Sequence, residues 1–309
     1  MSTTSSLEIT IAGIHMKNPV IAASGTFGFG KEYSSLVDLN KIGAIITKGT
    51  SLEPWVGNPP ERIAETAAGM LNSIGLQNDG VENLINEKLP WLSQFDVPVI
   101  VNIVGHTIEE YAEVAQRLSE TDSVAGLEIN ISCPNVKHGC IAFGVDPRMT
   151  FEVVNAVRKA THLPIIPKLS PNVTDIVAIA HAAVDAGADA ISLINTLIGT
   201  SINAETRMFR LANITGGLSG PAIKPIALRM VWEVAKAVDV PVIGVGGIMT
   251  AEDAVEFMLA GASAIQVGTA NFVYPNAMIE IIEGLEAYLS RHGFRHISEI
   301  VGIVQSPQC

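Results

Sequence analysis

Eight short apolar runs recur along the chain, and they restrict its fold more than any other feature. Each run is rich in valine and isoleucine, is apolar almost throughout, and is followed by Gly, Asn, Ser or Pro. Strands of a parallel sheet that is covered on both faces have this continuous pattern, whereas strands with one solvated face alternate. The runs span residues 19–24, 43–48, 98–104, 126–132, 164–170, 190–195, 241–247 and 264–269.

Helical patterns lie between these runs. Segments 107–120 and 250–263 each start at a threonine and carry acidic residues in the first turn, and segment 173–189 contains a C-cap signal at Gly187. Strands that alternate with helices in this way indicate a single-domain (β/α)8 TIM barrel over residues 1–309. An open doubly wound sheet is the alternative. The strand count and the lack of an evident linker favour the barrel.

Two connections are too long to be simple turns, namely residues 49–80 and 196–220. Both follow strands, so both are expected as long loops on the C-terminal face of the barrel. Ordered loops of this length on that face usually cover a site. The N-terminal stretch LEITIAGIHMKNP (7–19) is expected to form a hairpin that closes the opposite end.

The composition excludes several classes of protein. A net charge of −12 disfavours DNA or RNA as a partner. No apolar run reaches the roughly 18 residues of a membrane span, and MSTTSSLEIT lacks the regions of a secretory signal. Cys133, Cys140 and Cys309 are too scattered for a disulfide framework or a metal cluster. We therefore expect a cytoplasmic protein with reduced thiols.

One nucleotide-binding motif is incomplete. GTFGFGKE (25–32) nearly matches the phosphate-binding loop of NTPases, but Glu32 replaces the hydroxyl residue that would bind magnesium. No strand–helix unit carries the glycine fingerprint of a dinucleotide site, and no histidine spacing predicts a metal. An NTPase, a nicotinamide site on this chain and a metal centre are therefore not expected.

Polar residues occupy the C-terminal ends of the predicted strands, where a barrel holds its active site. A lysine in an apolar strand is costly unless it meets an anion or an electron-rich partner, and a paired carboxylate would explain a single one. Two lysines and three asparagines at equivalent heights favour a cationic, amide-lined pocket for a planar, carboxylated ligand. These residues are Lys48, Asn102, Asn130, Lys168, Asn195 and Thr196.

Glycines follow the last two strands. GVGG (244–247) and VGT (267–269) would let backbone N–H groups approach a phosphate, and GGLSG (216–220) would add a contact. Tight-turn chemistry is the alternative explanation. A phosphate at this end and a planar group across the barrel mouth fit flavin mononucleotide (FMN), with Lys168 near the ring to stabilise the charge of the reduced flavin.

Cys133 lies in the loop after the fourth strand, beside the expected flavin and substrate. A thiol there is placed to act as a general base, taking a proton from one carbon while hydride leaves its neighbour. A nearby lysine or loop amides would favour the thiolate. A buried, inert side chain is the alternative, since free cysteines are often buried.

Several motifs together resemble dihydroorotate dehydrogenases. They are NISCPNVKHG, KLSPNVTDI, LINTLIG, ANITGGLSGPAIKP, GVGGI and ASAIQVGTANF, and the resemblance covers about residues 7–290. A cysteine base is the mark of the cytosolic class 1. Within that class, CPNVKHG and NTLIG look most similar to the catalytic subunit of the NAD-dependent class 1B enzyme.

The resemblance implies oxidation of (S)-dihydroorotate to orotate in pyrimidine (UMP) synthesis, with FMN as first acceptor. It gives Cys133 the role of the base that removes the C5 proton, while hydride passes from C6, and makes residues 132–143 a lid. The implied substrate contacts are Lys48, Asn72, Ser73, Ile74, Gly75, Leu76, Asn130, Asn195 and Thr196. The implied FMN contacts are Ser24, Lys48, Gly49, Asn102, Asn130, Lys168, Ile194, Gly220, Gly246, Gly247, Gly268 and Thr269.

The resemblance also implies a partner. Class 1B enzymes pair this chain with an electron-transfer subunit that carries FAD and a 2Fe-2S cluster, in a heterotetramer of two catalytic and two electron-transfer chains that reduces NAD. The chain departs from the family at Cys140, where a glycine is expected. Cys309 lies in a tail that the resemblance does not cover.

Three alternatives remain open at this point. One is a class 1A homodimer that uses fumarate without a partner. Another is a barrel aldolase in which Lys168 forms a Schiff base. The last is a barrel that binds a nucleotide without catalysis, which Cys133, Lys48 and the asparagines argue against.

Overall fold

The predicted barrel is present. The computed structural model describes residues 6–131 and 143–306, and in it eight parallel strands close on themselves in the order β10-β15-β16-β3-β4-β7-β8-β9. Every predicted apolar run contributes one of them, so the open doubly wound sheet is wrong. The strands are β3 (Val20–Ala22), β4 (Ala44–Ile46), β7 (Val99–Ile103), β8 (Gly126–Asn130), β9 (Ile165–Leu169), β10 (Ile191–Leu193), β15 (Val242–Val245) and β16 (Ala264–Val267).

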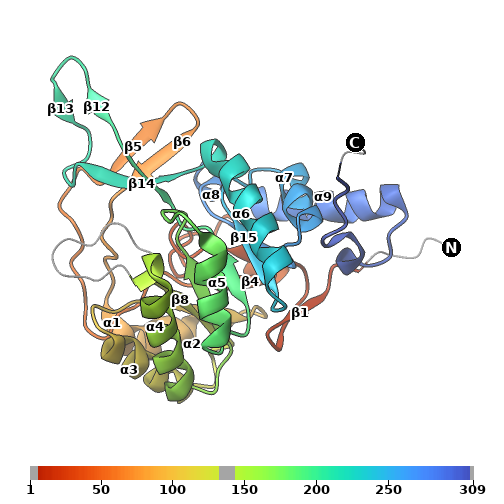
Figure 1. The fold of residues 1–309 in the computed structure, drawn as a ribbon, viewed down its shortest axis with the longest axis horizontal. Coiled ribbons are helices and arrows are strands. Elements are labelled where there is room, and N and C mark those ends of the chain that lie inside the picture. Colours follow the sequence, from red (N-terminus) through yellow and green to blue (C-terminus); the bar gives the residue numbers. More distant parts are fainter. Residues whose placement is uncertain (1–5, 132–142, 307–309) are drawn as a thin grey trace.

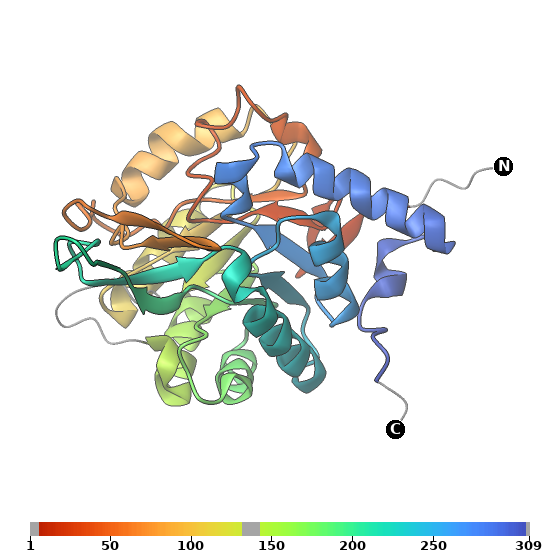
Figure 2. The same ribbon diagram turned by 90° about the horizontal axis from the view of Figure 1, so that it is seen from above.

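Helices surround the barrel (Figures 1 and 2). The α-helices are α1 (Gly80–Asn83), α2 (Leu89–Leu92), α3 (Ile108–Ser119), α4 (Pro147–Ala160), α5 (Ile176–Asp185), α6 (Lys224–Ala237), α7 (Ala251–Leu259), α8 (Ala270–Val273) and α9 (Ala277–His292). A π-helical turn, η2 (Leu84–Lys88), joins α1 to α2, and short 3-10 turns are η1 (Leu39–Lys41), η3 (Phe143–Val145), η4 (Pro221–Ile223) and η5 (Ile297–Ile300).

The predicted helix starts are confirmed by their caps. The Thr107 side chain accepts a hydrogen bond from the backbone N–H of Glu110 at the start of α3. At the start of α7, Thr250 and Asp253 form a capping box, in which each side chain accepts from the other residue's backbone. Gly187 and Gly261, just beyond α5 and α7, take positive φ angles of 99° and 118°, as expected where a helix ends.

The N-terminal hairpin closes one end of the barrel, as predicted. Strands β1 (Ile9–Ile11) and β2 (Ile14–Met16) pair antiparallel. Ile11, Ile14 and Met16 are buried in one cluster with residues from the N-terminal parts of the barrel strands, among them Ile100 and Ile166. The C-terminal ends of the strands are therefore the ones left to form a site.

The two long connections do not stay as loops. They pair with each other in a four-stranded sheet of order β11-β14-β6-β5, and Figures 1 and 2 show β5 and β6 beside β14, away from β1. Their place over the C-terminal face is as predicted. The strand pairing within them was not predicted, because the pairing partners lie far apart in the sequence. The strands are β5 (Ile63–Thr66), β6 (Gly69–Asn72), β11 (Leu197–Thr200) and β14 (Thr215–Ser219), and a small hairpin joins β12 (Ile202–Asn203) to β13 (Met208–Phe209).

Within residues 6–131 and 143–306, no helix is both long enough and apolar enough to span a bilayer.

Candidate active site

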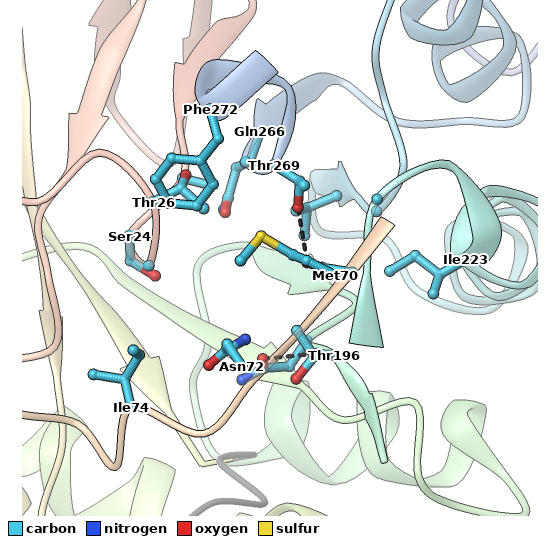
Figure 3. A pocket seen from close by; sticks show the side chains of 18 of the residues that line it. Ser24, Thr26, Met70, Asn72, Ile74, Thr196, Ile223, Gln266, Thr269 and Phe272 are labelled. Atoms are coloured by element: carbon cyan, nitrogen blue, oxygen red, sulfur yellow. Dashed lines mark hydrogen bonds between the residues drawn. The ribbon is translucent and has the colours of Figure 1, made fainter. Parts of the chain in front are cut away.

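A cavity of about 350 Å³ lies at the C-terminal ends of the barrel strands, under the four-stranded sheet (Figure 3). With the exception of Ser73, every predicted site residue within the described ranges lines it. These residues are Ser24, Lys48, Gly49, Asn72, Ile74, Gly75, Leu76, Asn102, Asn130, Lys168, Ile194, Asn195, Thr196, Gly220, Gly246, Gly247, Gly268 and Thr269. Cys133 and Cys140 lie outside the described residues, as does Cys309.

Ser73 is placed differently from its neighbours. Its side chain is fully buried, whereas Asn72 and Ile74 line the cavity. Successive side chains of an extended segment point to opposite sides, which explains why Asn72 and Ile74 line the cavity and Ser73 between them does not. The buried Oγ of Ser73 has no hydrogen-bond partner within the described part of the chain, and the role of Ser73 as a substrate contact stays a prediction.

The cavity has two different walls. Figure 3 shows Met70 extending between Asn72 and Thr196 on one side and Thr26 and Phe272 on the other. The sheet supplies Met70 and Asn72 from β6. The barrel supplies Thr196, which follows β10. The sheet and the barrel therefore each complete the site, and neither encloses it alone.

Lys48, just after β4, supplies a positive charge to the cavity. Burial of its ammonium lowers the pKa of Lys48 below the usual value of a lysine, and the nearby guanidinium of Arg62 lowers it further. Asp79 and Glu32 act in the opposite direction. Arg62 also lines the cavity, and its Nη1 donates to Gln77 Oε1 over 2.8 Å. The sequence analysis missed Arg62 because it lies within a long connection and in no strand pattern.

The three asparagines form a connected row of amides across the barrel mouth. The Nδ2 of Asn130 donates to the Oδ1 of Asn102 over 3.4 Å, and the Nδ2 of Asn195 donates to the Oδ1 of Asn130 over 3.3 Å. The hydroxyl of Tyr111 holds the end of β8 by donating to the carbonyl oxygen of Asn130 over 2.8 Å. The predicted amide-lined pocket is thus present in the structure.

A buried carboxylate lies beneath this row, and the sequence analysis missed it. Glu128 has no solvent exposure, and its Oε1 lies 3.3 Å from the Nζ of Lys168. That Nζ also donates to the Oε1 of Gln266 over 3.0 Å. Lys168 therefore has a paired carboxylate, which by itself would explain a lysine in an apolar strand, and Lys168 also lines the cavity.

A signal for these residues exists in the sequence. On five strands a polar residue stands two positions after a small or apolar residue, which places both on the inner face of the barrel. The pairs are Ile100 with Asn102, Gly126 with Glu128, Ile166 with Lys168, Ala190 with Ser192, and Ala264 with Gln266. An apolar layer against the hairpin is thus followed by a polar layer at the cavity.

Two groups stand out among the glycines that line the cavity. Gly220, Gly246 and Gly247 have positive φ angles, and an added Cβ on Gly247 would lie 2.8 Å from the backbone nitrogen of Lys224. Their glycine identity is explained by turn and packing geometry. Gly25 and Gly268 are different, because an added Cβ would meet nothing within 4 Å at Gly25 and nothing closer than 3.7 Å at Gly268.

This second group fits a bound planar cofactor with a phosphate. Gly25 and Gly268 both line the cavity, and an added Cβ would clash with nothing at either position, so packing within the chain does not explain why both are glycines, whereas a ligand in the cavity would. Thr26, which lies beside Phe272 in Figure 3, also lines the cavity, and its buried Oγ1 has no hydrogen-bond partner within the described part of the chain. Among the described residues there is also no cluster of His, Cys, Asp or Glu suited to a metal ion.

The fold and the site define a TIM-barrel protein with its ligand cavity at the C-terminal face of the strands. The family model described as dihydroorotate dehydrogenase matches residues 6–289, so the chain belongs to the dihydroorotate dehydrogenase family. The predicted resemblance is confirmed. Membership in this family removes the support for an aldolase that uses Lys168 and for a barrel without catalytic function.

Curated relatives resemble the chain along nearly its whole length. A protein of Geotalea uraniireducens (strain Rf4), named dihydroorotate dehydrogenase B (NAD(+)), catalytic subunit, is 61% identical over 296 residues, covering 96% of this chain and 97% of that protein. A protein of the same name from Geotalea daltonii is 60% identical over 299 residues, with coverage of 97% and 98%.

A solved structure shares the fold. The crystal structure of DHODH in complex with ferulenol from Eimeria tenella superposes with a TM-score of 0.81 at 22% identity, covering 96% of this chain and 88% of that one.

Proposed function

We propose that this chain is the catalytic subunit of an NAD-dependent dihydroorotate dehydrogenase, which oxidises (S)-dihydroorotate to orotate in pyrimidine synthesis. The observation that carries the proposal is the identity of about 60% over nearly the full length to proteins of that name. The cavity supports it independently, because it brings together a cationic side chain, a row of amides and a glycine-lined cradle.

FMN is the proposed cofactor of this cavity. Gly246, Gly247, Gly268 and Thr269 would hold its phosphate, and Lys168 would lie near its ring. Ser24, Lys48, Gly49, Asn102, Asn130, Ile194 and Gly220 complete the proposed set of contacts. When bound, FMN supplies the acceptor for the hydride that leaves C6 of dihydroorotate.

The substrate would lie between the amide row and the residues after β6. The ammonium of Lys48 would bind its carboxylate, and the amides of Asn72, Asn130 and Asn195 would hydrogen-bond its ring together with Thr196. Ile74, Gly75 and Leu76 also line the cavity. Amide groups both donate and accept, which suits a ring that carries alternating N–H and carbonyl groups.

Cys133 is the proposed general base. It lies outside the described residues. In the sequence it comes three positions after Asn130, which ends β8 and lines the cavity. In this role the Cys133 thiolate takes the proton at C5. Residues 132–143 would then act as a lid that carries the base to the substrate.

A second subunit is proposed to take the electrons onward. The relatives are named catalytic subunits of an NAD(+) enzyme, and we propose a partner with FAD and a 2Fe-2S cluster in a heterotetramer of two chains of each kind. A class 1A enzyme that passes electrons to fumarate is the competing proposal. Co-purification of an iron–sulfur flavoprotein would separate the two.

An anaerobic absorption spectrum tests the proposed activity. The purified chain should show a flavin spectrum that bleaches when dihydroorotate is added. A protein with oxidised flavin that does not respond would contradict the substrate. A protein that cannot be reconstituted with FMN would contradict the cofactor as well.

A further inference from the structure

The buried carboxylate of Glu128 is the centre of a polar cluster that joins five strands of the barrel. Its Oε1 accepts from the Nδ2 of Asn102 over 2.7 Å and from the Nζ of Lys168 over 3.3 Å. Its Oε2 accepts from the Oγ of Ser192 over 2.9 Å and from the Nε2 of Gln266 over 2.7 Å. Both oxygens therefore have two donors each, which is close to the full capacity of a carboxylate.

Glu128 is not itself part of the cavity wall. Asn102, Lys168 and Gln266 line the cavity, whereas Glu128 and Ser192 lie beneath it with no exposure. Glu128 thus contacts three side chains that line the cavity, although its own side chain does not reach the cavity. The Nζ of Lys168 is held in place because it donates to both Glu128 and Gln266.

Stability alone gives a weak reason for such a cluster. Taking a carboxylate and an ammonium out of water is expensive, and well-packed apolar residues often replace a buried ion pair at no cost in stability. The layer below shows that this barrel interior accepts apolar side chains, since Ile46, Ile100, Ile166 and Ile243 fill it. A charge at the next layer, against the cavity floor, calls for a functional reason.

We propose that Glu128 is a positioning residue that holds Lys168 at the cavity floor and whose charge sets the reduction potential of the flavin bound there. The inference rests on the proposed FMN site. A reduced flavin gathers negative charge, which Lys168 stabilises and the neighbouring carboxylate opposes. Glu128 thereby keeps the net charge of the floor near zero and holds the flavin potential lower than an unpaired lysine would.

The main test is the midpoint potential of bound FMN in Glu128→Gln, which removes the charge and keeps the size of the side chain. We expect the preference for reduced over oxidised flavin to increase about tenfold or more, an upward shift of about 30 mV for a two-electron couple. Ser192→Ala is the matched control. It removes one hydrogen bond from the same carboxylate but keeps the charge, so it should lower the melting temperature without moving the potential.

A second pair of variants keeps the test decisive if Glu128→Gln does not fold. Lys168→Met should lower the flavin potential, and Glu128→Gln in the Lys168→Met background should raise it again toward the wild-type value, because both charges are then absent. Equal flavin potentials in Lys168→Met and in the double variant would overturn the inference. A shift in potential in Ser192→Ala as large as that in Glu128→Gln would also overturn it.

The outcome also separates this inference from the proposed function. A folded wild-type chain that binds no FMN overturns both. A flavoprotein reduced by dihydroorotate, whose potential does not respond to Glu128, overturns only the role of Glu128.

Discussion

Gly69 and Gly220 pack backbone against backbone where the two long connections meet above the cavity. A Cβ added to Gly220 would lie 2.6 Å from the Cα of Gly69, and Gly220 has a φ angle of 96°. The contact joins β6 to the end of β14, so it fixes the sheet over the barrel mouth. The two glycines lie far apart in the sequence, and no local sequence pattern predicts that they meet.

We expect Gly220→Ala to destabilise the protein by at least about 3 kcal/mol, because it combines a steric clash with a strained φ angle. Gly293→Ala is the matched control. Gly293 has a φ angle of 76° but nothing within 4 Å of an added Cβ, so only the conformational cost of about 1–2 kcal/mol applies. Chemical denaturation measures both. Equal losses would contradict the importance of the close approach.

Filling the glycine cradle should separate folding from cofactor binding. Gly268→Val adds a side chain at the cavity wall whose Cβ would clash with no protein atom, since the nearest one is Ala23 Cβ at 3.7 Å. The thermal stability of the protein without cofactor should change little, whereas FMN should bind at least about tenfold more weakly, a loss of about 1.4 kcal/mol. Fluorescence titration with FMN measures the affinity. Unchanged affinity would place the cofactor elsewhere.

Binding of orotate should weaken at alkaline pH through Lys48. Burial and Arg62 lower the pKa of Lys48, so its ammonium loses its proton at a lower pH than a free lysine. The charge that would bind the carboxylate is present below that pKa and is lost as the pH rises through it. Orotate titrations between neutral and alkaline pH should therefore show the affinity starting to fall at a pH lower than the usual lysine pKa of about 10.4.

The same ionisation predicts the behaviour of two variants at Lys48. Lys48→Arg keeps a positive charge at every accessible pH, so the alkaline loss of affinity should disappear from its profile. Lys48→Met should bind orotate about 10- to 100-fold more weakly at neutral pH, because a charged hydrogen bond is lost. An alkaline loss that persists in Lys48→Arg would assign the titration to another group.

The stability of the protein should follow the sign of the same shift. Between the lowered pKa of folded Lys48 and the ordinary pKa of an unfolded lysine, the unfolded chain binds more protons. The contribution of Lys48 therefore makes the free energy of unfolding rise with pH in this window. Denaturation at several alkaline pH values should show this slope in the wild type and not in Lys48→Met.

Cys133→Ala should retain FMN yet reduce it about 10²- to 10⁴-fold more slowly with dihydroorotate, because the proposed base is absent and the flavin contacts are not. Cys140→Gly is the control, since it changes the second thiol of the same segment to the residue expected in the family. It should reduce FMN at nearly the wild-type rate. Stopped-flow measurement of flavin bleaching compares them. Normal reduction by Cys133→Ala would exclude this base.

The local features of this protein could be read from its sequence. All eight strands followed from continuous apolar runs, and helix starts such as Thr107 and Thr250 followed from caps that act within one turn. The strand-end residues Lys48, Asn102 and Lys168 could be placed at one cavity because a parallel barrel brings the C-terminal ends of its strands to one face.

Other features depended on contacts between distant segments, and only the tertiary structure decided them. β6 pairs with β14, so that Asn72 lies opposite Gly217, and no periodicity in the sequence specifies which strands pair. In the sequence Glu128 is a single acid in an apolar strand, and only the folded barrel brings four hydrogen-bond donors from four other strands to its carboxylate. Hydrophobic periodicity sets which face of an element is buried, but the closure of the barrel sets which polar side chains meet inside it.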